Sequence, residues 1–250
     1  MLTDKIGLVT GAGSGIGRAC AVTMAVEGAS VMVSDVDESG GQETVSLIRQ
    51  AGGTAEFTRC DVRNSGETLA LVTATVAHFG RLDCAVNNAG IAGKLGVPAA
   101  DYPEDIWDQV MAINLTGVWY CMKHEIKQMQ QQGGGAIVNM SSAAGLIGLP
   151  NAAYTASKHG VVGLTKSAAV TYSAENIRIN SVCPGYVPTP AVQPALDAAA
   201  GMEDALIAMH PMGRLGTEEE IANAVVWLCS DKAGFMAGHA LAVDGALVVK

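Results

Sequence analysis

Seven short apolar segments recur along the chain, and the stretches between them carry an apolar residue every three or four positions. The segments are IGLVT, VMVSD, AEFTRCDV, LDCAVNNAG, AIVNMSS, IRINSVCPG and ALAVDG. Their near-continuous hydrophobicity predicts strands that are buried on both faces, as in a parallel sheet between two layers of helices. The alternation therefore predicts a doubly wound α/β fold with right-handed crossovers.

Nothing in the sequence divides this pattern into parts. It contains no linker, internal repeat or low-complexity tract, and 250 residues with 49% hydrophobic content can bury one large core. The triplet Gly133–Gly135 follows the polar segment KQMQQQ, so it predicts a helix end rather than a domain boundary. We therefore expect residues 1–250 to form a single domain.

Composition and charge disfavour several classes of function. The apolar runs are shorter than the roughly 18 residues of a membrane span, and the N-terminus enters a strand pattern without a signal-peptide core. These features predict a soluble, cytoplasmic protein. A net charge of -9 disfavours nucleic acids, anionic membranes and acidic carrier proteins as partners. Six cysteines without a CxxC pair predict reduced, packed thiols and no metal site.

A glycine-rich segment, TGAGSGIG at Thr10–Gly17, lies between the first predicted strand and the first predicted helix. Its glycines allow a tight turn and the close approach of a pyrophosphate to the helix N-terminus. Asp35 ends the second predicted strand, where a carboxylate can bind both ribose hydroxyls of an adenosine and repel a 2′-phosphate. Together they predict a dinucleotide site that prefers NAD to NADP. The alternative for Asp35 is a solvated residue that only closes a strand.

Tyr154 and Lys158 lie four residues apart in the segment YTASK. In a helix this offset is about one turn, so both side chains share one face. The ordinary pKa of a phenol is about 10. An adjacent ammonium and a positive nicotinamide ring are expected to lower the pKa of Tyr154 and make it a useful base. The alternative is a core tyrosine beside a lysine that reaches the surface.

Together, the glycine spacing T-G-x-x-x-G-x-G, the segment NNAG at Asn87–Gly90 and the segment YTASK resemble the short-chain dehydrogenase/reductase family over essentially the whole chain. The resemblance implies a Rossmann-type fold with a mostly parallel, seven-stranded sheet, usually assembled as a homotetramer. It also implies hydride exchange between a nicotinamide cofactor and an alcohol or carbonyl.

The same resemblance implies four catalytic residues: Asn114, Ser142, Tyr154 and Lys158. Tyr154 would exchange the proton, Ser142 would bind the substrate oxygen, and Asn114 would hold a water that links Lys158 to solvent. Ser142 precedes Tyr154 by twelve residues where several family members have thirteen, so Ser141 stays an alternative. Without a catalytic role, Ser142 would be a turn former and Asn114 would make a core hydrogen bond.

A set of cofactor contacts also follows from the resemblance. Asp61 and Val62 would border the adenine, Asn87 and its neighbours would border the adenosine ribose, and the loop PGYVPT would meet the nicotinamide. Asn87 could equally stabilise the centre of the sheet. The predicted contacts are Gly11, Ser14, Gly15, Ile16, Gly17, Asp35, Asp61, Val62, Asn88, Ala89, Gly90, Tyr154, Lys158, Pro184, Gly185, Val187 and Thr189.

We expect the substrate lid at roughly residues 188–215. The segment TPAVQPALDAAAGMEDALIAMHPM has no Arg or Lys to bind a carboxylate or phosphate, which predicts a neutral, fairly apolar substrate. His210 is expected either at the pocket mouth or in helix packing. The apolar C-terminal segment ALVVK predicts a subunit interface, and the methyl group of Ala246 is expected to restrict positive φ.

These observations predict an NAD-dependent oxidoreductase that interconverts a neutral, fairly apolar secondary alcohol and its ketone, with Tyr154 as acid and base. Within the family, the alternatives are an NADPH-dependent reductase of carrier-bound β-ketoacyl groups and a sugar dehydrogenase. From another class, an NAD-binding regulator would need the glycines and Asp35 but would have no need for Tyr154 and Lys158.

Overall fold

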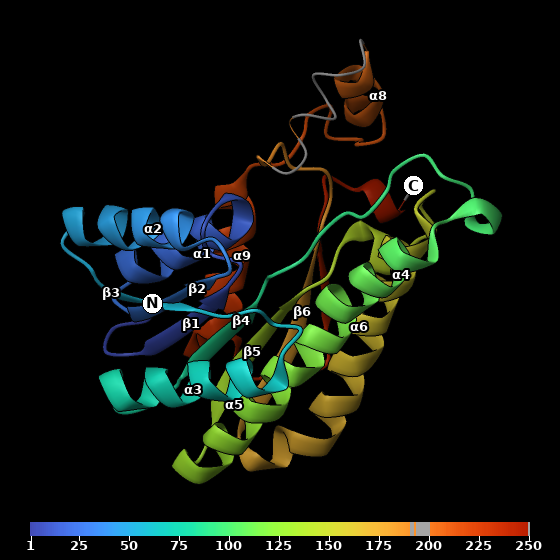
Figure 1. Cartoon of the computed structure of the whole chain (residues 1–250). Coiled ribbons are helices and arrows are strands. Elements are labelled where there is room, and N and C mark those ends of the chain that lie inside the picture. Colours follow the sequence, from blue (N-terminus) through green and yellow to red (C-terminus); the bar gives the residue numbers. More distant parts are fainter. Residues whose placement is uncertain (191–192, 194–200, 250) are drawn as a thin grey trace.

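The computed structural model describes residues 1–190, 193 and 201–249. In this part of the chain, seven strands form one parallel sheet in the order β3-β2-β1-β4-β5-β6-β7 (Figure 1). The strands are β1 Ile6–Thr10, β2 Ser30–Asp35, β3 Thr54–Arg59, β4 Cys84–Asn87, β5 Gly135–Met140, β6 Ile177–Pro184 and β7 Ala240–Val243. Each overlaps one of the seven apolar segments, so the predicted sheet is confirmed.

Helices connect the strands. The α-helices are α1 Gly15–Val26, α2 Glu38–Gln50, α3 Ser65–Phe79, α4 Glu104–Met111, α5 Val118–Gln132, α6 Ala152–Tyr172, α8 Met202–Ala208 and α9 Glu218–Cys229. A π-helical segment, η2 Ala112–Gly117, joins α4 to α5. The short 3-10 segments are η1 Ala99–Asp101, η3 Ala143–Gly145, η4 Ser173–Glu175, η5 Asp231–Ala233 and η6 Leu247–Val249. Gly133 ends α5 with φ 87, which confirms the predicted helix end.

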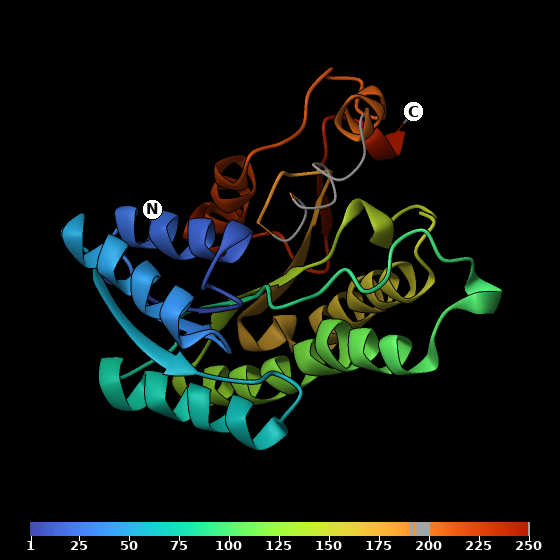
Figure 2. The same ribbon diagram turned by 45° about the horizontal axis from the view of Figure 1, so that its top comes forward.

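Each face of the sheet carries its own apolar core. Helices α1, α2 and α9 cover one face, and α3, α5 and α6 cover the other (Figures 1 and 2). In β1, Val9 packs into the first core and Leu8 into the second. Successive strand residues point to opposite faces, so a strand that is covered on both sides must be apolar at every position. This requirement explains the hydrophobicity of the inner strands, whereas the edge strands β3 and β7 are only partly buried.

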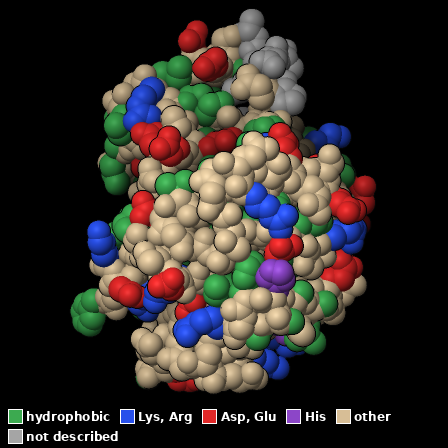
Figure 3. Space-filling view, turned by 90° about the vertical axis from the view of Figure 1, so that its left-hand side faces the viewer, with side chains coloured by type: hydrophobic (Ala, Val, Ile, Leu, Met, Phe, Trp, Pro, Cys, Tyr) green, Lys and Arg blue, Asp and Glu red, His purple; other side chains and the backbone are tan. Residues whose placement is uncertain are grey.

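The distribution of surface charges and the state of the cysteines agree with what the composition predicts. On the side where α2 and α3 lie in Figure 1, acidic and basic side chains are interspersed (Figure 3). The ion pairs Arg49–Glu56 and Arg59–Glu67 join the segments there. All six cysteines are buried free thiols, which confirms the prediction of packed thiols. In the described ranges, no helix combines the length and apolarity needed to cross a bilayer.

The chain leaves β7 in an unexpected conformation. Ala246 adopts φ 71, so its methyl group does not prevent the positive φ that it was expected to restrict. The Asp244 carboxylate holds this turn because its Oδ1 accepts from the Ala246 amide at 3.1 Å and its Oδ2 from the Val248 amide at 2.9 Å. Beyond the turn, Leu247 is buried and Val249 is 79% exposed.

A carboxyl group is fully buried beside the sheet. Glu125 on α5 accepts from Asn87 Nδ2 through Oε2 at 3.0 Å, and Asn87 Nδ2 also donates to Asn139 Oδ1 at 3.0 Å. These contacts favour the alternative that the sequence left open for Asn87, a residue that stabilises the sheet centre. Among the described residues, Glu125 Oε1 and Asn87 Oδ1 have no hydrogen-bond partner. Burial raises the pKa of Glu125 to about 7. A proton on Oε1 could bond to Asn87 Oδ1 and complete an acid–amide pair.

We expect Glu125 to make the free energy of unfolding decrease as the pH rises from about 5 to about 8. Its folded pKa of about 7 lies above the ordinary value of 4.5, so the folded state binds more protons than the unfolded state in this interval. Glu125→Gln supplies a donor and an acceptor without titrating. The substitution should therefore remove about 3 kcal/mol of this pH dependence.

Urea unfolding of both proteins at several pH values measures the effect. Glu175→Gln changes an exposed glutamate and is the matched control, which should keep the wild-type pH dependence. Parallel pH profiles for the wild type and Glu125→Gln would contradict a protonated acid in the core.

Candidate active site

The glycine-rich loop forms a cradle at the N-terminus of α1. Gly11 and Gly15 adopt φ 63 and φ 57, values that favour residues without a Cβ. A methyl group on Gly17 would lie 2.0 Å from the Gly11 carbonyl oxygen, so only glycine allows this closure. Ser14 caps α1 without a side-chain hydrogen bond. The first amides of a helix have no intrahelical partner and lie at the positive end of the dipole, so this cradle fits a pyrophosphate.

Asp35 is fixed beside this cradle. Its Oδ2 accepts from the Gly13 amide at 2.8 Å, and its Oδ1 accepts from the Asp37 amide at 3.0 Å. The carboxylate therefore stands at the edge of the glycine loop, where the sequence placed a ribose-binding acid. Both oxygens keep lone pairs for further donors, so the group can still bind two hydroxyls.

The end of β4 connects the cradle to the catalytic residues. Asn88 Nδ2 donates to the carbonyl oxygens of Thr10 and Gly11 at 3.1 Å and 3.0 Å. A methyl group on Gly11 would lie 2.7 Å from Ala89 Cα. A methyl group on Gly90 would lie 3.3 Å from Asn114 Oδ1 and 3.6 Å from Lys158 Nζ. The segment Asn88–Gly90 thus runs from the glycine loop to the residues expected to react.

Asp61 and Val62 follow the end of β3. Asp61 forms an ion pair and Val62 is packed against other residues of the chain. Hydrogen bonds from Arg63 lower the pKa of Asp61, and the Arg63 Nε lies 2.9 Å from Asp61 Oδ1. Val62 is buried, and a methyl group on Gly117 would lie 2.8 Å from its Cγ2. Their expected contact with adenine stays a prediction.

The loop after β6 closes the other side of the cradle. Pro184 ends β6, Gly185 follows it, and Val187 is buried against the first core. A methyl group on Gly15 would lie 3.5 Å from Thr189 Cβ, so this loop reaches the start of α1. The expected lid at 188–215 lies only partly within the described residues, since 191–192 and 194–200 are outside them.

Tyr154 and Lys158 share one face of α6, as predicted. Lys158 Nζ lies over the Tyr154 ring, 5.5 Å from its centroid, and donates to the Met140 carbonyl oxygen at 2.8 Å. Asn151 caps α6, since its Oδ1 accepts from the Tyr154 amide at 3.3 Å. Its Nδ2 donates to the Ala92 carbonyl oxygen at 2.7 Å and ties the helix start to the loop after β4. The cap therefore positions Tyr154.

Burial dominates the ionisation of both residues. It lowers the pKa of Lys158 to about 8 and raises the pKa of Tyr154 above its ordinary value. The Ser142 hydroxyl opposes the rise at Tyr154, and the Tyr186 phenol adds to it. In the protein alone, burial is the largest influence on the Tyr154 pKa, and the lowering expected with a bound nicotinamide stays a prediction.

The structure separates the two candidate serines. Ser141 is buried, and its Oγ donates to the Lys158 carbonyl oxygen at 2.9 Å. Ser142 caps η3 by accepting from the Ala144 amide at 3.1 Å. Its hydroxyl also interacts with the Tyr154 phenol and lowers the pKa of that phenol. Ser142 is therefore the serine beside the phenol, while Ser141 secures the α6 backbone.

Asn114 lies inside the π-helical segment and is fully buried. Its Oδ1 accepts from the Ile91 amide and its Nδ2 donates to the Ile91 carbonyl oxygen, both at 2.9 Å. A longer contact of 3.3 Å joins Nδ2 to Ser157 Oγ. The side chain is thus engaged in local hydrogen bonds, as expected for a core amide. The π-helical segment interrupts the regular helix bonding at this point, and the water-holding role stays a prediction.

Two further residues lie at this edge, and the sequence assigned no role of its own to one of them, Tyr186. Tyr186 follows the end of β6 and interacts with the Tyr154 phenol. His210 is 3% exposed, and its Nε2 accepts from the Tyr186 amide. It also lines a small pocket together with Tyr186, so it has features of both expected positions, the pocket mouth and helix packing. The available signal was the position of Tyr186 within PGYVPT, directly beyond a strand end, where open α/β sheets bind ligands.

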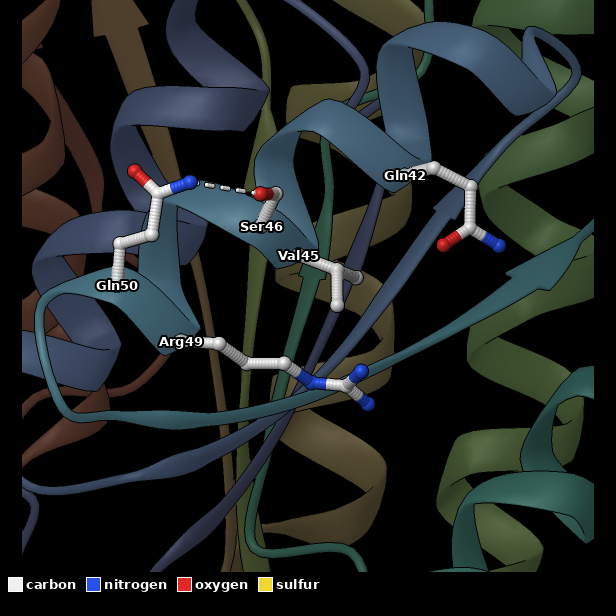
Figure 4. A pocket seen from close by; sticks show the side chains of 5 residues that line it. All are labelled: Gln42, Val45, Ser46, Arg49 and Gln50. Carbon is white, nitrogen blue, oxygen red and sulfur yellow. Dashed lines mark hydrogen bonds between the residues drawn. The ribbon is translucent and has the colours of Figure 1, made fainter.

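Two features lie apart from this site. A surface pocket of about 360 Å³ runs along α2 and is lined by Gln42, Val45, Ser46, Arg49 and Gln50 (Figure 4). The pocket is lined by residues from the middle and the C-terminal end of α2, whereas Asp35 precedes the N-terminus of this helix. Within the described residues, no group of three or more His, Cys, Asp and Glu side chains could hold a metal ion.

The arrangement can transfer a proton beside a bound dinucleotide. A nicotinamide, when bound, supplies hydride exchange. Tyr154 can take the proton of an alcohol or return it to a carbonyl oxygen, and Ser142 can donate to the same oxygen as its negative charge grows. Lys158 Nζ donates to the Met140 carbonyl oxygen and lies over the Tyr154 ring, so it supplies positive charge near the phenol.

Comparisons with known proteins agree with this geometry. A family model described as "Enoyl-(Acyl carrier protein) reductase" matches residues 11–247. The chain is 44% identical over 246 residues to a 2,5-dichloro-2,5-cyclohexadiene-1,4-diol dehydrogenase from Sphingobium indicum. This match covers 98% of the chain and 97% of the relative. It is 43% identical over 249 residues to a cyclohexanol dehydrogenase from an Acinetobacter species, and this match covers 99% of the chain and 96% of the relative.

Solved structures give the same result. The structure of a levodione reductase superimposes with a TM-score of 0.95 at 38% identity and covers 99% of both chains. The family match and these relatives span nearly the whole sequence, and the glycine cradle, the segment after β4 and the Tyr154–Lys158 helix occur in one site. The chain therefore belongs to the short-chain dehydrogenase/reductase family.

Proposed function

We propose that this protein is an NAD-dependent dehydrogenase that interconverts a neutral, fairly apolar cyclic secondary alcohol and its ketone. The convergence of Tyr154, Lys158 and Ser142 beside the glycine cradle carries the proposal. Asn114 supports these residues from the π-helical segment. The whole chain acts as one catalytic domain, with the predicted cofactor contacts arranged along the carboxyl edge of the sheet.

Two observations support the cyclic, neutral substrate class. Two relatives are named for substrates with a six-membered ring, a cyclohexadienediol and cyclohexanol. The segment between Thr189 and Met212 contains no Arg or Lys, so it offers no cation for a carboxylate or phosphate. NAD is the proposed cofactor because the Asp35 carboxylate stands where an NADP 2′-phosphate would be repelled.

The test is the absorbance change at 340 nm with NAD or NADP against cyclohexanol, aryl and open-chain secondary alcohols, and sugars. Turnover of the cyclic alcohols with NAD is the expected result. A preference for sugars, or NADPH-linked reduction of β-ketoacyl thioesters, would replace the proposed substrate class. NADH binding without turnover of any compound would favour an NAD-binding regulator.

We also propose that the protein functions as a cytoplasmic homotetramer. Three large apolar side chains support assembly because they are exposed on separate segments: Trp119 on α5 at 47%, Val170 on α6 at 89% and Phe235 before β7 at 106%. Apolar exposure of this kind is typical of subunit contacts. Sedimentation equilibrium should give about four times the mass of the chain, and a monomer at micromolar concentration would contradict the assembly.

A further inference from the structure

Tyr186 is placed at the reacting end of the site by the sheet. Strands β5 and β6 are hydrogen-bonded neighbours, with Met140 opposite Val182. Ser142 and Tyr186 both lie two residues beyond the ends of their strands, so they occupy the same edge. The phenols of Tyr154 and Tyr186 are close enough to interact electrostatically. Tyr186 therefore lies at the edge of the sheet where Ser142 stands beside Tyr154.

Within the described residues, the Tyr186 hydroxyl is free to bind a ligand. The side chain is half-buried, and no hydrogen bond joins its hydroxyl to another of the described residues. Burial raises the pKa of Tyr186 above its ordinary value, so the phenol is neutral at physiological pH and can donate a hydrogen bond. A half-buried polar group of this kind is suited to fixing the orientation of a ligand.

His210 anchors the loop that carries Tyr186. Its Nδ1 lies 2.7 Å from the Leu206 carbonyl oxygen on α8, and its Nε2 lies 3.2 Å from the Tyr186 amide nitrogen. A donor at Nδ1 and an acceptor at Nε2 satisfy both contacts, which requires the neutral ring. The Tyr186 ring packs edge-on against the imidazole, with centroids 5.9 Å apart. Gly185 is necessary here because a methyl group on it would lie 2.7 Å from His210 Nε2.

The reacting oxygen does not need Tyr186. A carbonyl oxygen has two lone pairs, and Ser142 and Tyr154 supply two donors for them. We propose that Tyr186 binds a second oxygen function on the substrate, so that the site selects cyclic alcohols with an additional hydroxyl or carbonyl group, and that His210 positions Tyr186 for this contact. The proposal rests on the proposed alcohol dehydrogenase function and narrows its substrate class.

The test compares cyclohexanol with the 1,2-, 1,3- and 1,4-cyclohexanediols as substrates of the wild type and Tyr186→Phe. The wild type should have a higher kcat/KM for at least one diol than for cyclohexanol. Tyr186→Phe should lower the ratio of the diol kcat/KM to the cyclohexanol kcat/KM by about 3- to 10-fold, as expected for one neutral hydrogen bond. Tyr120→Phe, on α5 away from this edge, is the matched control and should change neither value.

Equal effects of Tyr186→Phe on both substrate types, or no diol preference in the wild type, would overturn the proposal. Calorimetric titration of the diols into the NADH-bound proteins gives the same comparison without turnover. Weaker diol binding to Tyr186→Phe would support the contact even if the wild type oxidised none of the alcohols, an outcome that would reject only the dehydrogenase function.

The positioning role of His210 is tested by two amides of different reach. Gln can replace Nε2 as the acceptor for the Tyr186 amide, whereas Asn can replace only the Nδ1 contact with Leu206. His210→Asn should raise the KM for the preferred diol by about 3- to 10-fold with little change in kcat, and His210→Gln should restore it. His78→Asn on α3 is the control. Equal KM values for the two His210 variants would reject the positioning role.

Discussion

Replacing Tyr154 with Phe should lower kcat by roughly 10²- to 10⁴-fold, the usual contribution of a positioned acid or base. The substitution removes the hydroxyl beside Ser142 and keeps the ring over which Lys158 Nζ lies. The proton of the alcohol then has no acceptor among the groups that the structure brings to this point. The measurement is kcat with the preferred alcohol at saturating NAD.

Two controls separate the chemistry from the fold. NADH affinity, measured by fluorescence titration, and the Tm of Tyr154→Phe should both stay close to the wild-type values, because the glycine cradle and the Asn151 cap are unchanged. Tyr120→Phe removes a phenol from α5 and should keep full turnover. A kcat of Tyr154→Phe within threefold of the wild type would contradict the acid and base role.

Asp35→Asn should reduce the preference for NAD over NADP, measured as the ratio of the two kcat/KM values, by at least about tenfold. Two unit charges about 4 Å apart near a protein surface interact with roughly 1 to 4 kcal/mol, and the substitution removes this repulsion toward a 2′-phosphate. The neutral amide also binds ribose hydroxyls less strongly than a carboxylate. Most of the change should appear as a higher KM for NAD and a lower KM for NADP.

Asn can retain only one acceptor oxygen for the amides of Gly13 and Asp37, so the loop itself needs a control. Asp37→Asn changes the neighbouring acid, whose Oδ1 caps α2 by accepting from the Ser39 amide, and should leave the cofactor ratio unchanged. A wild-type ratio in Asp35→Asn, or an equal change in both variants, would remove Asp35 as the residue that selects the cofactor.

The fold could be predicted from local sequence patterns because burial of strands and backbone conformation are encoded by a few neighbouring residues. A strand covered on both faces must be apolar at nearly every position, and this requirement accounts for the inner strands. It does not apply to the edge strands β3 and β7, which are only partly buried. The glycines of the first loop adopt conformations that other residues rarely adopt, so their spacing alone indicated the cradle. The offset of four residues placed Tyr154 and Lys158 on one helical face.

The roles of single polar residues were less accessible because they depend on partners far away in the sequence. Asn87 has an ordinary strand position, and only the approach of Glu125 and Asn139 draws it into the core. Ser141 and Ser142 are adjacent, and the backbone direction after β5 decides which of them lies beside Tyr154. The link between His210 and Tyr186 joins residues 24 positions apart across two segments.

By itself, the sequence determined the sheet, the nucleotide cradle and the helix that carries Tyr154 and Lys158, since backbone conformation and hydrophobic period are encoded over a few neighbouring residues. Only the tertiary structure decided the ionisation of the buried groups and the partner of each polar side chain. Desolvation depends on everything that packs around a group, so burial raises the pKa of Tyr154 although a lysine stands one turn away. Sequence spacing brings charges together, and the surrounding packing decides how strongly each is desolvated.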